Sequence, residues 1–93
     1  MTARDIIIFD LDGTLADLSH RLKFIDGETK DWDAFFELCD KDAVIEPIAQ
    51  LFRTLGQETG YSLWISSGRS DQVRSKTLDW LTQNRMFPDK LIS

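Results

Sequence analysis

The feature that most limits how this chain can fold is an apolar run that ends in two closely spaced acids, IIIFDLDGT at residues 6–14. Residues 6–9 are unbroken, apolar and mostly β-branched, which is typical of a strand buried on both faces of a parallel sheet. If the strand continues, Asp10 and Asp12 point to the same side, because side chains at i and i+2 share a face. Ligands of open parallel sheets bind beyond the carboxyl ends of the strands. The pattern therefore predicts a ligand site here.

The two residues that follow the acids favour a sharp turn. Gly13 supplies backbone freedom, and the hydroxyl of Thr14 is expected to hold the turn with a hydrogen bond. A solvated acidic turn is the alternative interpretation of such a short pattern. A calcium-binding EF-hand loop is excluded, because Leu15 and Arg21 stand where that loop needs glycine and glutamate.

The rest of the chain alternates between patterns typical of helices and of strands. Apolar residues follow helical spacing after Asp31, which predicts an N-cap, and after Pro47, which suits a first helical turn. Ser70 predicts the cap of a third helix. The expected elements are a strand at 6–9, helices at 32–39 and 47–55, a strand at 61–66, a helix from 70 and a strand from 90. This order predicts an α/β fold with a parallel sheet and right-handed crossovers.

Size and composition limit the classes of protein to consider. The 93 residues, 42% of them hydrophobic, predict a single small domain over residues 1–93. No apolar run approaches the roughly 18 residues of a membrane span, so we expect a cytoplasmic protein with no membrane partner. Cys39 is the only cysteine, and we expect it to be buried and structural. The net charge of −5 argues against broad attraction to nucleic-acid duplex, although a small basic site remains compatible with it.

Two motifs in the right order resemble those of a known superfamily. FDLDGTLAD resembles the first signature of the haloacid dehalogenase-like (HAD) phosphatases, and LWISSGR resembles the second, with Ser67 as the better match and Ser66 as the weaker one. The segments SHRL, DWDAFF and SGRSDQVRSKTLDWL are similar to the phosphatase domain of phage-type polynucleotide kinases. The resemblance implies the amino-terminal part of a three-layer, Rossmann-like HAD core with about three strands. It also implies a flap and helical segment at about 13–58.

The resemblance also implies a chemistry, which is Mg²⁺-dependent hydrolysis of a phosphomonoester. In this scheme Asp10 attacks phosphorus to form an aspartyl-phosphate, and Asp12 protonates the leaving alcohol and later activates water. Mg²⁺ would be held by the Asp10 carboxylate and the Asp12 backbone carbonyl. The substrate would be a nucleotide or a nucleic-acid end, with a polynucleotide 3′-phosphate as one candidate. The residues expected to bind phosphate are Gly13, Thr14, Ser67, Gly68 and Arg69, helped by the amino end of the helix that begins near Ser70.

Several other side chains near these motifs can be interpreted in two ways. Arg69 either grips a phosphate or forms a surface ion pair with Asp71 or Asp17. Three charged residues of the expected flap either contact substrate or are solvated charges; they are His20, Arg21 and Lys23. Three aromatic residues of the first helix could stack on bases, although their helical spacing favours a place in the core; they are Trp32, Phe35 and Phe36.

The third and fourth signatures of the superfamily, a lysine and a later acidic pair, have no match. Lys76 falls inside a predicted helix, Lys90 opens a strand, and no acid follows Asp89. We therefore expect a truncated chain, a gene fragment, or a chain whose missing motifs are supplied by a second chain. We expect little activity from the 93 residues by themselves. The alternative function is a non-catalytic fragment or a phosphate- or metal-binding module. The superfamily's strand order would leave residues 6–9 at an edge open to self-association.

Overall fold

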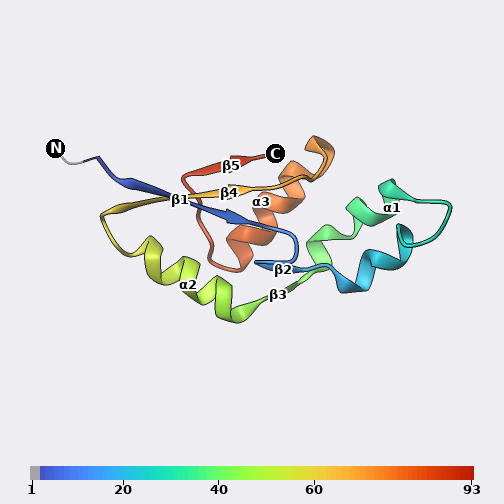
Figure 1. The fold of residues 1–93 in the computed structure, drawn as a ribbon, viewed down its shortest axis with the longest axis horizontal. Coiled ribbons are helices and arrows are strands. Elements are labelled where there is room, and N and C mark those ends of the chain that lie inside the picture. The colour runs from blue at the N-terminus through green and yellow to red at the C-terminus, as the bar shows by residue number, and fades with distance from the viewer. Residues whose placement is uncertain (1–2) are drawn as a thin grey trace.

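The computed structural model describes residues 3–93 and has a parallel three-stranded sheet at its centre. The strands lie in the order β1-β4-β5, and a second, antiparallel pair joins β2 to β3 (Figure 1). The strands are β1 (Asp5–Asp10), β2 (Ala16–Asp17), β3 (Ala43–Val44), β4 (Tyr61–Ser66) and β5 (Lys90–Ile92). The α-helices are α1 (Trp32–Glu37), α2 (Glu46–Gly56) and α3 (Arg74–Gln83), and the 3₁₀ helices are η1 (Ser19–Phe24), η2 (Cys39–Lys41) and η3 (Asp71–Val73). The predicted α/β class is confirmed.

Helices α2 and α3 connect the parallel strands and lie on the same side of the sheet (Figure 1). A strand order that advances in one direction requires this, because crossovers between parallel strands are right-handed. Phe9 of β1 packs edge-on against Phe52 of α2, with ring centroids 5.1 Å apart. Trp80 and Leu81 of α3 join the same buried cluster. The hydrophobic core therefore fills the space between the sheet and these two helices.

The opposite face of the sheet is more open than the sequence suggests. Residues 6–9 were expected to be covered on both faces, but Ile6 and Ile8 are 52% and 57% exposed. Only alternate residues of β1 face the two helices, and no described element packs over the other set. Within residues 3–93, β1 pairs only with β4. Self-association through this edge stays a prediction.

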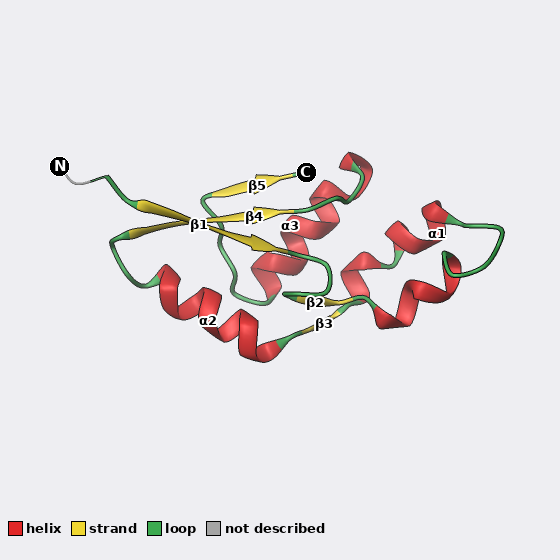
Figure 2. Ribbon diagram, viewed as in Figure 1, coloured by secondary structure: helices red, strands yellow, loops and turns green. Residues whose placement is uncertain are grey.

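Residues 16–44, from β2 to β3, leave the sheet and return to it, and we call this segment the insert (Figure 2). It contains η1, α1 and η2, which extend from one end of the sheet and contribute to principal extents of 52 × 23 × 20 Å. Asp31 caps α1 as predicted, because its side chain accepts a hydrogen bond from Ala34 N at 3.0 Å. The sequence pattern missed η1 and the β2–β3 pair, which are too short to show a period.

The other elements agree with expectation apart from their ends. β4 and β5 lie where their apolar runs place them, and Pro47 sits in the first turn of α2. Ser70 caps a 3₁₀ turn through a hydrogen bond from Gln72 N at 3.2 Å, so α3 itself begins only at Arg74. No helix in residues 3–93 has the length and apolar character needed to cross a membrane.

Candidate active site at the carboxyl end of the sheet

The two predicted motifs meet where β1 and β4 end. Asp10, the last residue of β1, is in register with Ser66, the last residue of β4. The chain then continues through Asp12 on one side and Ser67 on the other. Because parallel strands end at the same edge, these segments lie next to each other. The expected clustering of the two motifs at one edge of the sheet is therefore present.

The turn after β1 is held by backbone hydrogen bonds. The carbonyl of Leu11 accepts bonds from the backbone N–H groups of Thr14, Leu15 and Ala16 at 3.2, 2.9 and 3.0 Å. Gly13 has φ of +82°, a conformation that side chains other than glycine's rarely adopt. The expectation that the Thr14 hydroxyl holds the turn is wrong, because its backbone N–H does so and its hydroxyl has no partner among residues 3–93.

Asp12 is held by two arginines that come from distant parts of the chain. Arg21 Nη2 donates to Asp12 Oδ1 at 3.0 Å, and Arg69 donates to the same oxygen from Nη2 at 2.8 Å and from Nε at 3.2 Å. The other oxygen, Oδ2, receives only one long contact, 3.4 Å from Arg69 Nε. The carboxylate is 25% exposed. The arginines thus fix Asp12 through one oxygen and leave the other available for a proton transfer.

A second aspartate, Asp42, joins the same arginines from the end of the insert. Its side chain is fully buried and accepts bonds from Arg21 Nε and Nη2 at 2.8 and 2.7 Å and from Arg69 Nη2 at 3.1 Å. His20 Nε2 lies 2.6 Å from Asp42 Oδ1, and Trp80 Nε1 donates to the Asp42 backbone carbonyl at 2.8 Å. We call Asp12, Arg21, Asp42 and Arg69 the charge cluster. It joins the insert to the turn after β1 and to the segment after β4.

Arg21 is a correction to the sequence interpretation. The solvated alternative for the flap charges fails here, because Arg21 is fully buried. Its Nη1 donates to the Phe35 carbonyl at 3.1 Å, and its guanidinium carbon lies 4.4 Å from the centre of the Phe35 ring. Burial opposes the charged form, but the hydrogen bonds and charge of Asp42, with the charge of Asp12, outweigh it and raise the pKa of Arg21. The guanidinium therefore stays charged inside the protein.

Arg69 does not form the surface ion pair considered for it, and its role as a phosphate ligand stays a prediction. It is buried, and its partners are Asp12, Asp42 and Thr77, whose hydroxyl accepts a bond from Arg69 Nη1 at 3.0 Å. The surface partners proposed from sequence bond elsewhere. Asp71 accepts from the Ser93 hydroxyl at 2.8 Å, and Asp17 accepts from Ser19, which lowers the pKa of Asp17.

Asp42 is the site residue that sequence reasoning missed. No motif surrounds it, and it lies 30 positions after Asp12 and 27 before Arg69. Charged residues in loops give only a weak sequence signal for a buried cluster, because most such charges are solvated. The part of the chain that the structure describes has no buried side-chain nitrogen or oxygen without a hydrogen-bond partner. The charge cluster is thus fully satisfied, as buried polar groups require.

Ser67 and Gly68 lie where the second motif predicts. Ser67 is buried at the end of β4, its backbone N–H donates to the Ile92 carbonyl at 2.7 Å, and its Oγ accepts a bond from Arg69 N at 3.1 Å. An accepting hydroxyl still has its own proton to donate. Gly68 is exposed, and a side chain there would meet nothing within 4 Å. The Ser67 hydroxyl and the open space beside Gly68 can accommodate an anion.

Asp10 differs from Asp12 in having no partner. It is exposed, and its carboxylate makes no ion pair or hydrogen bond with any other residue of 3–93. Residues 3–93 also hold no cluster of three or more His, Cys, Asp or Glu side chains suited to a metal. Mg²⁺ commonly takes only one or two carboxylates, with water and substrate oxygens completing its shell. The free Asp10 carboxylate therefore fits a magnesium ligand.

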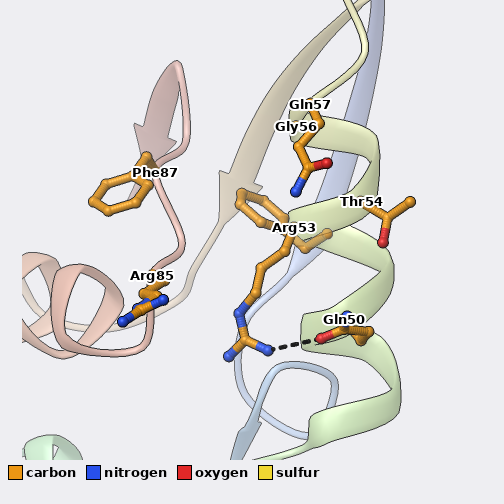
Figure 3. Close-up of a pocket in the computed structure, with 8 residues that line it drawn as sticks. Gln50, Arg53, Thr54, Gly56, Gln57, Arg85 and Phe87 are labelled. Atoms are coloured by element: carbon orange, nitrogen blue, oxygen red, sulfur yellow. Dashed lines mark hydrogen bonds between the residues drawn. The ribbon is translucent and has the colours of Figure 1, made fainter.

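A separate cleft of about 400 Å³ lies between α2 and the segment after α3, and Figure 3 shows its lining. Arg53 in this cleft is already bonded to Gln50 at 3.2 Å, to Glu46 at 3.0 Å and to the Asn84 carbonyl at 2.9 Å. None of the residues predicted for the site lines this cleft. The candidate active site therefore lies at the carboxyl end of the sheet and not in this cleft.

Comparison with known proteins agrees with this geometry. The family described as "Polynucleotide kinase PNKP phosphatase domain" matches residues 4–92. A solved structure of "the Pnkp1/Rnl/Hen1 RNA repair complex" is similar with a TM-score of 0.74 and 27% identity, over 97% of this chain and 25% of that one. A second structure of the Pnkp1/Rnl/Hen1 complex has a TM-score of 0.70 and 28% identity, over 96% of this chain and 27% of that one.

No curated protein sequence matches the chain significantly. The chain spans about a quarter of the length of the solved chains that it resembles. The family match, in contrast, extends over nearly all of the described residues and includes both motifs that meet at the end of the sheet. The chain belongs to the family of polynucleotide kinase phosphatase domains, within the HAD phosphatases.

Proposed function

We propose that this chain provides the catalytic aspartates of a Mg²⁺-dependent phosphatase that removes phosphate from a nucleotide or from the end of a nucleic acid. The observation that supports it most is the contrast between the two acids of the first motif. Asp10 is exposed and unpaired, which leaves its carboxylate free to attack, whereas Asp12 is fixed by two guanidiniums. An RNA end is the first candidate substrate, because a similar solved structure is that of an RNA repair complex.

In the proposed first step, an oxygen of Asp10 attacks phosphorus and the bond from phosphorus to the leaving oxygen breaks. Asp12 gives its proton to that oxygen, so the alcohol leaves neutral and phosphate stays on Asp10. In the second step Asp12 takes a proton from water, and the resulting hydroxide attacks phosphorus. The bond from phosphorus to Asp10 breaks, which releases inorganic phosphate and restores both side chains.

The arginines act as positioning groups in this scheme. They contact Asp12 mainly through Oδ1, so the proton transfers are assigned to Oδ2. Asp42 holds both guanidiniums in place. Fixing a proton donor beside the reacting oxygen lowers the entropic part of the barrier. Arg69 is therefore expected to affect all substrates alike, rather than to grip a second phosphate of an oligonucleotide.

Asp10 through its carboxylate and Asp12 through its backbone carbonyl would hold Mg²⁺, which when bound offsets the negative charge of the phosphate and the attacking carboxylate. The chain's own contribution to phosphate binding is the Ser67 hydroxyl proton, which would donate to a phosphate oxygen. The segment from Gly68 lies open beside it, so backbone N–H groups there can approach the anion.

A phosphate- or metal-binding module without turnover is the second candidate. One observation favours it: Asp12, the assigned acid and base, is already engaged by two arginines. The two candidates differ in what Mg²⁺ does. An enzyme releases phosphate when Mg²⁺ is added, whereas a binding module takes up metal or phosphate and releases nothing.

The test is to measure phosphate release from glycerol 2-phosphate and from a 3′-phosphorylated oligonucleotide, with and without Mg²⁺. Asp10→Asn should abolish turnover, because an amide is a poor nucleophile. Asp12→Asn should slow turnover by about 10²–10⁴-fold, the usual contribution of acid–base catalysis. Asp79→Asn, an exposed acid on α3, is the matched control and should behave as wild type. Full activity in Asp10→Asn would refute the proposal.

A further inference from the structure

A groove of about 530 Å³ lies between α1 of the insert and the segment 70–76, outside the charge cluster. Trp32 and Phe36 form one wall, and Gln72 and Lys76 form part of the other. Lys76 Nζ bonds to the Glu37 carbonyl and carboxylate, both at 2.8 Å, and so joins the two walls. The volume falls within the range of pockets that bind small organic groups.

Both walls of the groove are directly connected to groups that hold Asp12. On the α1 side, Phe35 precedes Phe36 and accepts the hydrogen bond of Arg21 Nη1 at 3.1 Å. On the other side, Ser70 lines the groove and directly follows Arg69 in the chain. One wall of the groove therefore begins at Ser70, three residues after Ser67, which is the residue proposed to bind the phosphate.

The aromatic wall is arranged for stacking. Trp32 is 48% exposed, so it is not a core residue as its helical spacing suggested, whereas Phe35 is buried. The Trp32 and Phe36 rings lie 6.0 Å apart at an interplanar angle of 27°, and Phe35 meets both edge-on at 5.7 and 5.4 Å. These contacts restrain the indole. Lys30 Nζ also lies 5.9 Å from the centre of the Trp32 ring. A planar ligand can cover the part of the indole that these contacts leave exposed in the groove.

The charges of the groove disfavour an anion and favour a ligand with hydrogen-bond donors. Asp33 and Glu37 both line it. Lys76 is engaged by Glu37 and lies 4.0 Å from Asp40, so its charge is already matched. A phosphate would be repelled by the two carboxylates, whereas an amino or imino N–H would be accepted by them. A nucleobase combines such groups with a planar ring.

We propose that this groove binds the nucleobase of the nucleotide that carries the phosphate to be removed, with the base stacked on Trp32. The inference rests on the proposed phosphatase function and adds to it the part of the substrate that is recognised. The base enters the groove between α1 and the start of α3, while the phosphate lies at the end of the sheet. Asp33 and Glu37 disfavour a second phosphate in the groove itself.

The test uses the Asp10→Asn protein, so that ligands are not consumed, and measures binding by calorimetry in the presence of Mg²⁺. The probes are a dinucleotide with a 3′-phosphate, the same compound with an abasic terminal sugar, and a nucleoside 3′-monophosphate. Adding Trp32→Ala should weaken binding of the base-bearing dinucleotide at least about fivefold, in line with the usual strength of base stacking. Trp32→Phe should restore most of that loss. Phe87→Ala is the matched control, because Phe87 is equally apolar, is 67% exposed and lies in the other cleft.

The abasic ligand separates stacking from a general loss of the fold. If the protein with Trp32 intact binds the abasic and the base-bearing dinucleotides equally tightly, the groove does not hold a base. The same conclusion follows if Trp32→Ala weakens binding of both dinucleotides to the same extent. Tighter binding of the dinucleotide than of the monophosphate identifies a polynucleotide end as the source of the base, and equal binding identifies a free nucleotide. Turnover of glycerol 2-phosphate by the protein with Asp10 intact tests catalysis separately, since that substrate has no base.

Discussion

The sheet and the insert contain buried groups of opposite chemical character. Between the sheet and its two helices, the buried side chains are apolar, as the packing of Phe9 against Phe52 and the fully buried Ile65 illustrate. Where the insert meets the sheet, the buried side chains include the charged Arg21 and Asp42, beside the apolar Cys39. Apolar packing tolerates changes that preserve volume, whereas a buried ion pair tolerates little, because removing one partner leaves the other unpaired. The insert is therefore positioned more specifically, by groups that also hold Asp12.

The largest expected effect comes from removing the charge of Asp42. Asp42→Asn keeps the shape of the side chain but leaves Arg21 and Arg69 with one carboxylate between them, which should cost about 3–5 kcal/mol of stability. The free energy of unfolding from urea titration measures this. Glu46→Gln is the control, because Glu46 pairs with Arg53 at the surface and such pairs contribute only about 0–1 kcal/mol.

Cys39 reports whether that loss is confined to the insert. Burial raises the pKa of its thiol, although Arg69 and Arg21 oppose this, so the folded protein should react slowly with iodoacetamide near pH 8. In Asp42→Asn, made in a Trp32→Phe background so that the remaining tryptophans lie outside the insert, the labelling rate should rise at urea concentrations where the tryptophan signal is still native. If the two signals change together, the sheet and the insert unfold as one unit and the comparison fails.

A slightly smaller loss of stability is expected from a substitution in the apolar core between the sheet and its two helices. Ile65→Ala removes a fully buried side chain from the central strand and should cost about 2–5 kcal/mol. In this variant Cys39 labelling should accelerate only as much as global unfolding does, since the insert contacts are untouched. Ile8→Ala on the neighbouring strand is the control, because Ile8 is more than half exposed and loses much less apolar contact. Equal losses in the two variants would mean that the open face of the sheet is covered in solution.

The smallest effect concerns a local feature of the insert. Asp31→Ala removes the N-cap of α1 and should cost about 1 kcal/mol, as other N-cap substitutions do. Asp26→Ala changes an exposed acid of the preceding turn and should have almost no effect. Thermal melts of the two variants measure the difference. A cost as large as that of Asp42→Asn would show that helix formation, rather than the charge cluster, holds the insert.

The same contrast explains how far the sequence could predict the molecule. β4 was predicted residue by residue, because six residues of strand composition end at clear turn signals. Asp10, Asp12 and Ser67 were predicted because their motifs are local. The contact of Asp42 with Arg69 was not, since a charge has no period in the sequence and its partner lies 27 residues away. Exposure of Trp32 was missed because helical spacing indicates a face but not what covers it.

The account's central claim is that Asp10 receives the phosphate while the charge cluster holds Asp12 beside it. The most direct measurement is to incubate the protein with Mg²⁺ and an oligonucleotide labelled in its 3′-phosphate, quench in acid, and locate the label by mass spectrometry of the peptides. We predict label on Asp10 in the wild type, none in Asp10→Asn, and slower labelling in Asp42→Asn. Label on another residue, or phosphate release that persists in Asp10→Asn, would contradict the account.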